Sequence, residues 1–365
     1  MKKINLENVY IWGTGANAKK INEMYSYELA RLDLIGYIDN DKDKCGKMFY
    51  GKKVFSPDIL LSPGKKNIFI PNKHSEEIRQ QIKTEYREAD VNIINEDLIS
   101  RLHLIVRYEN SSEGEISEIV DYLIDHPLSY FNYPFTEKYT DELSIHFDAE
   151  KGLFYTIFCE KKMYFSRTYD TEEKVKAYYK SILLEQDKSS PHLYITEFFD
   201  VNAGSVVVDA GAAEGNFSLA IIDKVKKIYM FEPDNNWYEA LNYTFEPYKE
   251  KVCIINKVLS NYENDITTTI DISVQEPVNF IKMDVEGEEL YALIGALKTI
   301  NKSSELKCSI CTYHQEFAYQ VIKSFFDDLN MSIETSRGYM WYPDLRLRVP
   351  VLRRGIIRAK KGQGL

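Results

Sequence analysis

Apolar residues are spaced along this chain in blocks that predict short buried strands alternating with amphipathic helices. In the second half, the apolar runs at 205–208 and 228–231 are typical of strands buried on both faces of a parallel sheet. Between these runs, Asn216 can cap a helix in which apolar residues recur with helical spacing. The succession of strand, tight turn, helix and strand predicts an α/β unit.

The same alternation continues toward the end of the chain. A helix is expected to begin at Gly287, with core positions at Leu290, Leu293, Leu297 and Ile300. The last two expected strands suit an antiparallel hairpin at the edge of the sheet. The further strands of this unit are expected at 252–256, 278–283, 308–312, 331–334 and 355–358.

Residues 1–110 predict a second, smaller α/β unit. A strand at 9–12 leads into GTGANA, in which Gly13, Gly15 and Ala18 match G-x-G-x-x-A. The next strand, expected at 34–38, leads to Asp39, which could accept hydrogen bonds from a ribose. The same glycines also serve the packing of a helix on a strand, so a nucleotide site and a purely structural turn both stay open.

Residues 111–184 predict a connector between the two α/β units. Its helix, hairpin and second helix are expected at 116–124, 153–165 and 172–184. The polar segment 185–199 stands directly before the first strand of the larger unit and could close over a ligand, with His192 and Tyr194 as its candidate contacts. A loop with a surface or capping histidine is the alternative. The chain is expected to divide into 1–110, 111–184 and 185–365.

Composition and charge narrow the choice of function. The formal net charge of −10 argues against a general binder of nucleic acid or anionic membranes. No apolar run reaches the length of a membrane span, and the first residues lack the apolar region of a signal peptide, so we expect a cytoplasmic protein. The five cysteines favour reduced thiols, and Cys308 and Cys311 would point to opposite faces of one strand, which argues against a shared zinc ion.

The turn after the strand at 205–208 carries the first candidate chemistry. It reads D-x-G-x-x-x-G, with Asp209, Gly211 and Gly215, and Glu232 follows at the tip of the next strand. Glycines let backbone N–H groups approach a ligand, and Glu232 is placed to accept hydrogen bonds from a ribose diol. Asp209 would repel a pyrophosphate but favour a cation, and S-adenosylmethionine combines an ammonium, a sulfonium and a ribose. The alternative is a glycine-tolerant turn in some other α/β protein.

A second group of polar residues follows two later strands. Asp284 stands at the tip of the strand at 278–283, with Glu286 and Glu289 close behind it. Tyr313 and His314 stand at the tip of the next strand. Ligands bind at the carboxyl ends of strands in open α/β sheets, although the glutamates could simply favour a helix N-terminus.

These motifs together resemble those of the FkbM-type methyltransferases. The resemblance rests on VVVDAGAAEGNFS, FEPD, TTTIDISVQEPVNFIKMDVEGEELYALIGA and SICTYHQEF, and it covers about 185–360. It implies a Rossmann-like class I methyltransferase domain that uses S-adenosylmethionine to methylate hydroxyls of sugars or of glycosylated natural products. The chain departs from many members at Glu288, where they have a small residue. The N-terminal pattern resembles small Rossmann-like modules attached to sugar-modifying enzymes, so the expected fold class is α/β with two Rossmann-like units.

We accordingly expect the cofactor to bind at Asp209, Gly211, Gly215, Glu232 and Asp284. The catalytic residues are expected to be His314, Asp284 and Glu286, with His314 as the general base and Asp284 orienting its imidazole. A competing arrangement places a divalent cation between these three residues. Metal-using O-methyltransferases usually have Asp-Asn or Asp-Asp where this chain has Tyr313-His314-Gln315, which favours the metal-free base.

The expected function is O-methylation of a sugar, a glycan or a glycosylated metabolite. The acceptor would be a small molecule or saccharide, free or linked to a nucleotide. One alternative is a scaffold protein that keeps the methyltransferase fold and binds a nucleotide sugar without catalysis, and another is an enzyme using NAD at GTGANA. The sequence leaves the oligomeric state open.

Overall fold

The computed structural model describes residues 2–71, 75–94, 97–139, 143–343 and 350–362. Internal contacts divide these residues into two units, which meet in sequence between Tyr133 and Pro134. Residues 350–351 group with the first unit and 352–362 with the second. The helix of the expected connector thus groups with the first unit, and its hairpin and second helix with the second unit. The division at 110 and 184 stays a prediction.

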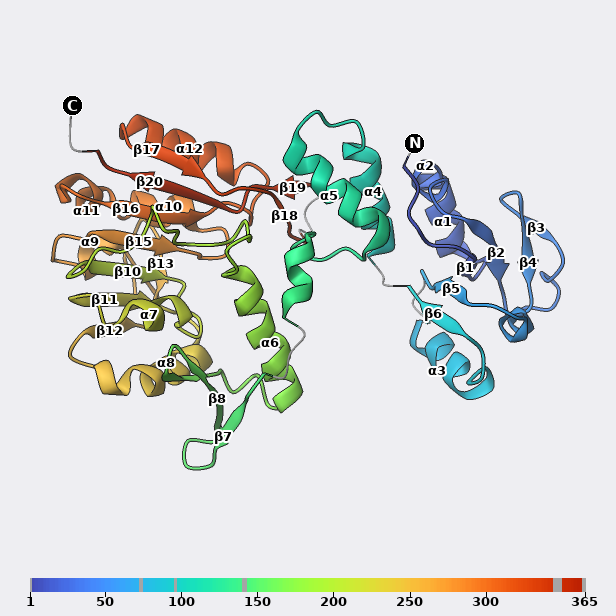
Figure 1. The fold of residues 1–365 in the computed structure, drawn as a ribbon, viewed down its shortest axis with the longest axis horizontal. Coiled ribbons are helices and arrows are strands. Elements are labelled where there is room, and N and C mark those ends of the chain that lie inside the picture. Colours follow the sequence, from blue (N-terminus) through green and yellow to red (C-terminus); the bar gives the residue numbers. More distant parts are fainter. Residues whose placement is uncertain (1, 72–74, 95–96, 140–142, 344–349, 363–365) are drawn as a thin grey trace. The chain divides into compact units, whose positions relative to one another are not determined.

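The first unit is built on a six-stranded sheet with strand order β3-β4-β2-β1-β5-β6 (Figure 1). All neighbouring strands are parallel except β3 and β4, which form a hairpin. This confirms the smaller Rossmann-like α/β unit. Its elements are β1 (Val9–Trp12), α1 (Ala16–Met24), α2 (Ser26–Leu29), β2 (Leu34–Ile38), β3 (Met48–Phe49), β4 (Lys52–Phe55), β5 (Lys66–Phe69), α3 (Ser75–Glu85), β6 (Val91–Ile93), α4 (Leu98–Tyr108) and α5 (Gly114–Asp125).

The second unit contains a seven-stranded sheet with strand order β12-β11-β10-β15-β16-β20-β17. The strands from β12 to β16 are parallel, whereas β20 is antiparallel to both β16 and β17, as expected for the final hairpin. The strands of this sheet are β10 (Val206–Ala210), β11 (Lys227–Phe231), β12 (Val252–Ile255), β15 (Phe280–Met283), β16 (Lys307–Cys311), β17 (Ser332–Thr335) and β20 (Ile356–Lys360). This order confirms the expected larger Rossmann-like α/β unit.

Helices and smaller sheets complete the second unit. The antiparallel ribbon β7-β8-β9 packs on α8, where Leu153 and Tyr164 contact Ala240. The helices are α6 (Glu172–Glu185), α7 (Asn216–Ile221), α8 (Asn235–Phe245), α9 (Ile270–Ser273), α10 (Glu289–Ile294), α11 (Leu297–Lys302) and α12 (Ala318–Asp328). The short strands are β7 (His146–Asp148), β8 (Leu153–Phe158), β9 (Lys161–Tyr164), β13 (Val258–Leu259), β14 (Thr267–Thr268), β18 (Met340–Trp341) and β19 (Leu352–Arg353).

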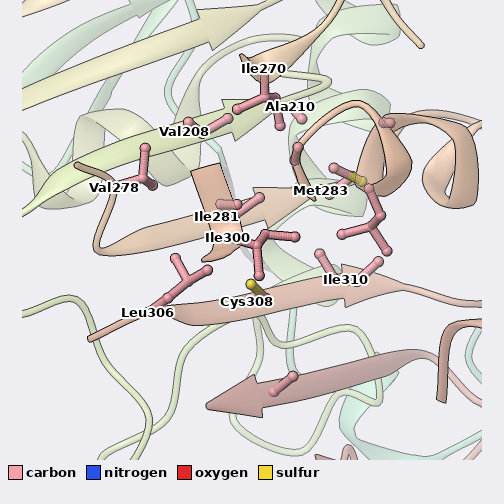
Figure 2. Close-up of a cluster of buried hydrophobic side chains, with 14 of the residues drawn as sticks. Val208, Ala210, Ile270, Val278, Ile281, Met283, Ile300, Leu306, Cys308 and Ile310 are labelled. Carbon is pink, nitrogen blue, oxygen red and sulfur yellow. The ribbon is translucent and has the colours of Figure 1, made fainter. Parts of the chain in front are cut away.

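One face of the large sheet packs against α10, α11 and α12 through a continuous apolar core (Figure 2). Val208, Ile281 and Ile310 come from adjacent strands of the sheet, and Leu293 and Ile300 come from the helices. All five side chains are buried, so burial on both faces explains why these strands are apolar throughout. The core fixes the carboxyl ends of the strands, where the polar residues stand.

Two local expectations were wrong. The helix expected from Gly287 is two helices, α10 and α11, which are interrupted at Gly295. A Cβ atom at Gly295 would lie 2.1 Å from the carbonyl oxygen of Ser260, so this residue marks a close backbone approach. Asn216, which was expected to cap the helix, is instead the first residue of α7, and Gly215 occupies the cap position.

In the described part of the chain, no helix combines the length and the apolar character needed to cross a membrane.

Candidate functional site

A cavity of about 420 Å³ lies in the second unit, at the carboxyl ends of β10, β11 and β15. Of the predicted cofactor and catalytic residues, Gly211, Glu232, Asp284 and Glu286 line it, whereas Asp209, Gly215 and His314 do not. The lining residues are Tyr178, Glu185, Tyr194, Gly211, Ala212, Ala213, Glu214, Asn216, Phe231, Glu232, Pro233, Trp237, Lys257, Val258, Leu259, Lys282, Asp284, Val285, Glu286 and Tyr313.

Asp209 is fully buried near the end of β10, where its carboxylate forms an ion pair and a hydrogen bond with neighbouring side chains. Its Oδ1 lies 3.1 Å from Nζ of Lys282, and its Oδ2 accepts a hydrogen bond of 2.6 Å from the Ser218 hydroxyl. Lys282 also donates to the carbonyl oxygen of Gly211 at 2.5 Å. Burial lowers the pKa of Lys282, but the carboxylates of Asp209 and Asp284 raise it more, so the ammonium stays charged. Asp209 therefore acts on the cavity through Lys282, which lines it.

Gly211 and Gly215 are required by close packing within the protein. Both have a positive φ, of 72° and 81°. A Cβ atom on Gly211 would lie 1.7 Å from the carbonyl oxygen of Asp284, and one on Gly215 would lie 2.6 Å from the Phe245 ring. We expected these glycines to let backbone N–H groups approach a ligand, and that contact stays a prediction. The structure adds that they make room for the backbone of Asp284 and for the Phe245 ring. Gly211 also lines the cavity.

Glu232 lies at the tip of β11, as predicted, with 7% of its surface exposed. One carboxylate oxygen accepts a hydrogen bond of 2.9 Å from the amide of Ala213, and the other accepts one of 2.9 Å from the amide of Asp234. Burial raises the pKa of Glu232, and the two amides partly offset this rise. The carboxylate is thus held in place and also faces the cavity.

Sequence reasoning missed several lining residues. Glu214 is buried and accepts a hydrogen bond of 2.6 Å from the Tyr178 hydroxyl. Burial raises its pKa to about 7, although the Tyr178 bond lowers it in part. Glu214 lies inside the D-x-G-x-x-x-G motif, so its position was available from the sequence. Tyr178 belongs to the part of α6 that was assigned to the connector, and no sequence signal placed it here. Glu185, the last residue of α6, begins the polar segment 185–199 that was expected to close over a ligand.

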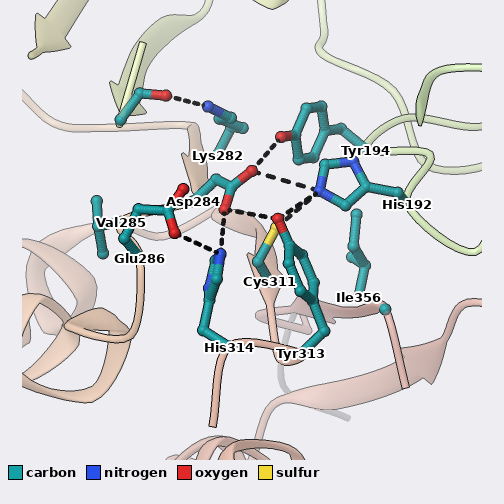
Figure 3. Close-up of polar contacts among 12 residues, drawn as sticks. His192, Tyr194, Lys282, Asp284, Val285, Glu286, Cys311, Tyr313, His314 and Ile356 are labelled. Carbon is teal, nitrogen blue, oxygen red and sulfur yellow. Dashed lines mark hydrogen bonds and ion pairs between the residues drawn. The ribbon is translucent and has the colours of Figure 1, made fainter. Parts of the chain in front are cut away.

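Asp284 is the centre of a polar cluster at the tip of β15 (Figure 3). Its Oδ2 accepts a hydrogen bond of 2.7 Å from Tyr194, and its Oδ1 accepts one of 3.3 Å from Tyr313. Nε2 of His192 lies 3.3 Å from Oδ2, and Nε2 of His314 lies 3.3 Å from Oδ1. Burial would raise the pKa of Asp284, but the two imidazoles and Lys282 lower it well below its usual range. Asp284 is therefore a fixed negative charge.

His314 is 3% exposed and has carboxylates beside both ring nitrogens. Nδ1 lies 2.8 Å from Oε1 of Glu289, while Nε2 faces Asp284 at 3.3 Å and Glu286 at 3.5 Å. Burial lowers the pKa of His314, but the hydrogen bond to Glu289 and the nearby carboxylates raise it above its ordinary value. Glu289 therefore makes the orienting contact to Nδ1 that we expected from Asp284.

Glu286 is the most exposed of the predicted catalytic residues, with 77% of its side chain accessible. Its φ of 55° is unusual for a residue with a side chain, and Gly287 follows with a φ of 103°. The Tyr342 hydroxyl donates to its Oε2 at 3.1 Å. This backbone conformation turns Glu286 toward the cavity and toward Nε2 of His314.

Two groups of side chains could hold a metal ion among the described residues. One comprises Asp284, Glu289 and His314, and the other comprises Asp284, His192 and Cys311. The first overlaps the expected cation site, with Glu289 in the place of Glu286. Both groups share Asp284, whose carboxylate the two tyrosines and two histidines already contact.

Residues 249–340, which include Asp284, Glu286 and His314, match the family model described as the Methyltransferase FkbM domain. Part of the second unit thus matches an FkbM-type methyltransferase domain. The methyl donor of such methyltransferases is S-adenosylmethionine. Residues 5–97, which lie within the first unit, match a family model described as C2185-like, N-terminal.

Solved structures similar to this chain include the methyltransferase FkbM from Methylobacillus flagellatus KT. The two sequences are 14% identical, 96% of this chain and 89% of that chain are covered, and the TM-score is 0.41. An rRNA methylase from Streptococcus thermophilus has 16% identity, coverages of 45% and 90%, and a TM-score of 0.31. SMU.1697c from Streptococcus mutans, in complex with SAH, has 15% identity, coverages of 51% and 97%, and a TM-score of 0.33. No curated protein sequence matches this chain.

The residues that line the cavity fit S-adenosylmethionine by their chemistry. The volume is within the roughly 300–1,000 Å³ typical of small-molecule sites. Carboxylates of Glu185, Glu214, Glu232 and Asp284 line it, which favours a ligand with positive charge. Tyr178 and Trp237 add aromatic faces on which a nucleobase or a cation can lie.

Proposed function

We propose that this protein is an S-adenosylmethionine-dependent O-methyltransferase that acts on a hydroxyl of a sugar, a glycan or a glycosylated metabolite. The observation that carries the proposal is the cavity itself: a carboxylate-lined space beside the cluster of Asp284, Glu286 and His314. A methyltransferase needs a cofactor site next to groups that align an acceptor and take its proton.

Glu232, Gly211, Gly215, Asp209 and Asp284 would hold the cofactor. Glu232 faces the cavity from a fixed position and would accept hydrogen bonds from the ribose diol. Gly211 keeps its turn close to the backbone of Asp284, Gly215 lets the turn pack on Phe245, and Asp209 fixes Lys282. When bound, S-adenosylmethionine supplies a methyl group that its sulfonium has already activated for displacement.

The acceptor hydroxyl must be aligned and must lose a proton. Asp284 and Glu286 line the cavity and would accept the hydrogen bond of the hydroxyl. Nε2 of His314 lies within 3.5 Å of both carboxylates and would take up the proton when the imidazole is neutral. Glu289 would hold Nδ1–H and thereby fix the tautomer that leaves Nε2 basic.

The saccharide acceptor rests on the resemblance of the motifs and on the chemistry beside Glu286. The rings of Tyr313 and Tyr342 lie 5.2 Å apart next to this carboxylate, and aromatic faces with nearby carboxylates suit a sugar ring. The net charge of −10 disfavours an RNA acceptor. The rival proposal, a nucleotide-sugar scaffold without catalysis, predicts cofactor-independent binding of the sugar.

Calorimetry with S-adenosylmethionine tests the cofactor site. Glu232→Ala should weaken binding about tenfold to a hundredfold, because a hydrogen bond to a charged group is lost. Glu250→Ala removes an exposed carboxylate elsewhere in the same unit and should leave binding unchanged. Unchanged affinity for S-adenosylmethionine in both Glu232→Ala and Gly211→Val would contradict the cofactor site.

A second experiment tests the acceptor. It measures the transfer of labelled methyl groups to a panel of free and nucleotide-linked sugars.

A further inference from the structure

One corner of the cavity combines a buried carboxylate with a wall of aromatic rings. Glu214 is 5% exposed, and its Oε2 accepts the 2.6 Å hydrogen bond from Tyr178. The ring of Tyr178 lies 5.3 Å from that of Trp237, and Tyr169 lies against both, at 4.4 Å and 5.7 Å. Glu214, Tyr178 and Trp237 all line the cavity.

The position of this carboxylate is fixed from two sides. Glu214 belongs to the turn between β10 and α7, next to Gly215, whose left-handed backbone packs on Phe245. Tyr178 belongs to α6 and is held by its neighbouring rings. A carboxylate that cannot move away retains its field at the ligand position.

The charges that line the cavity are mostly negative. Glu185, Glu214, Glu232, Asp284 and Glu286 contribute carboxylates, and the two lysines of the lining already have acidic partners. Nζ of Lys282 lies 3.1 Å from Asp209, and Nζ of Lys257 lies 3.4 Å from Glu263. The lining therefore favours a cationic ligand over a neutral one of the same shape.

The two forms of the cofactor differ in this property. S-adenosylmethionine carries a sulfonium charge, and its demethylated product, S-adenosylhomocysteine, has a neutral thioether at the same atom. Carboxylates and aromatic faces attract cations, and they have little preference for a thioether.

We propose that Glu214, held by Tyr178, is a specificity-determining residue that makes the cavity prefer S-adenosylmethionine over S-adenosylhomocysteine. The inference rests on the proposed function and adds a role for a residue that the cofactor motif does not require. Loss of the sulfonium charge on methyl transfer removes the attraction to Glu214. The product is then bound more weakly than the substrate and leaves the cavity.

Calorimetric titration of the full chain with each of the two compounds at pH 8.5, where Glu214 with its raised pKa of about 7 is ionised, tests the proposal. Glu214→Gln keeps the size of the side chain and an oxygen that can accept from Tyr178, but removes the charge. We expect the affinity for S-adenosylmethionine to fall about tenfold and that for S-adenosylhomocysteine to change less than twofold. Glu250→Gln, which removes an exposed charge from the same unit, should change neither.

Other outcomes have distinct meanings. Equal losses for the two compounds, or no loss for either, would overturn the selectivity role while leaving the cofactor site intact. A wild-type protein that binds neither compound would refute the proposed function itself. If Glu214→Gln does not fold by circular dichroism, Glu214→Ala serves instead. It also removes the charge, and an unchanged preference in that variant would overturn the proposal.

Discussion

At the residue scale, the chemistry depends on how carboxylates are distributed around His314. Glu289 contacts Nδ1, and Asp284 and Glu286 face Nε2. Their combined charge holds the pKa of His314 above its ordinary value despite burial. The imidazole is therefore charged at lower pH and becomes a base only as the pH rises through this raised pKa.

We predict that turnover rises with pH through the raised pKa of His314 and then levels off. His314→Ala should lower turnover by roughly 10²–10⁴ and leave S-adenosylmethionine binding intact, because only proton transfer is lost. The measurement is the pH–rate profile together with calorimetry, and His146→Ala, an exposed histidine in β7, is the control. Near-normal turnover in His314→Ala would rule out the base.

The same contacts predict a pH dependence of stability. Because His314 has a higher pKa in the folded than in the unfolded chain, its stabilising contribution is complete below the unfolded value near 6.5. The contribution is lost as the pH rises through the folded pKa. We expect Glu289→Gln to lower the free energy of unfolding by about 1.5–3 kcal/mol at pH 6, and by less at pH 9. Urea denaturation at the two pH values measures this, and a larger cost at pH 9 would contradict it.

A metal-free reaction is the third expectation at this scale. Asp284 is already surrounded by Tyr194, Tyr313, His192 and His314, which satisfy its charge without a cation. We predict that EDTA leaves turnover unchanged and that the purified protein contains no stoichiometric divalent metal by elemental analysis. Activity abolished by EDTA and restored by magnesium would favour the competing arrangement, in which a cation lies between Asp284, Glu286 and His314.

At the element scale, the turn between β10 and α7 is fixed by its contact with β15. Gly211 and Gly204 have nearly the same φ, 72° and 75°, but only Gly211 lies against another backbone. Gly204→Ala should cost about 1–2 kcal/mol for the left-handed conformation alone. Gly211→Ala should cost about 1–3 kcal/mol more, because its Cβ overlaps the carbonyl of Asp284. Equal losses in chemical denaturation would show that the contact is unimportant.

Strands were the elements most accurately predicted from the sequence. Apolar runs bounded by glycine and polar residues placed β1 and β2 to the residue, and β10, β11 and β16 within two residues. The break between α10 and α11 was not predictable, because it depends on the approach of Gly295 to Ser260, 35 positions earlier in the chain. Local periodicity continues through such a break and contains no information about it.

Within the candidate site, the sequence predicted residues that share a motif but missed those brought in from elsewhere. Glu232 and Asp284 stand where strand tips were expected. The orienting contact of Glu289 depends on the helix register after Gly287, and Tyr178 reaches Glu214 from α6, 36 positions away. Such contacts are set by tertiary packing, which the local pattern of residues does not contain.

At the scale of the whole molecule, the two units have separate cores and separate sheets. The apolar cluster around Ile281 and Phe326 contains residues of the second unit alone, and the cluster around Trp12 and Ile68 contains residues of the first. Every residue that lines the proposed cofactor cavity belongs to the second unit. Cofactor binding should therefore be a property of that unit.

We predict that a protein starting at Pro134 binds S-adenosylmethionine with an affinity within about threefold of the full chain, since a domain with its own core can fold alone. A protein ending at Tyr133 should not bind it, because the first unit contributes no residue to the cavity. Calorimetry on both fragments measures this, and Glu232→Ala in the larger fragment is the control for site-specific binding. A folded larger fragment that has lost binding would show that residues before Pro134 belong to the cofactor-binding unit, and that the boundary lies nearer to 110.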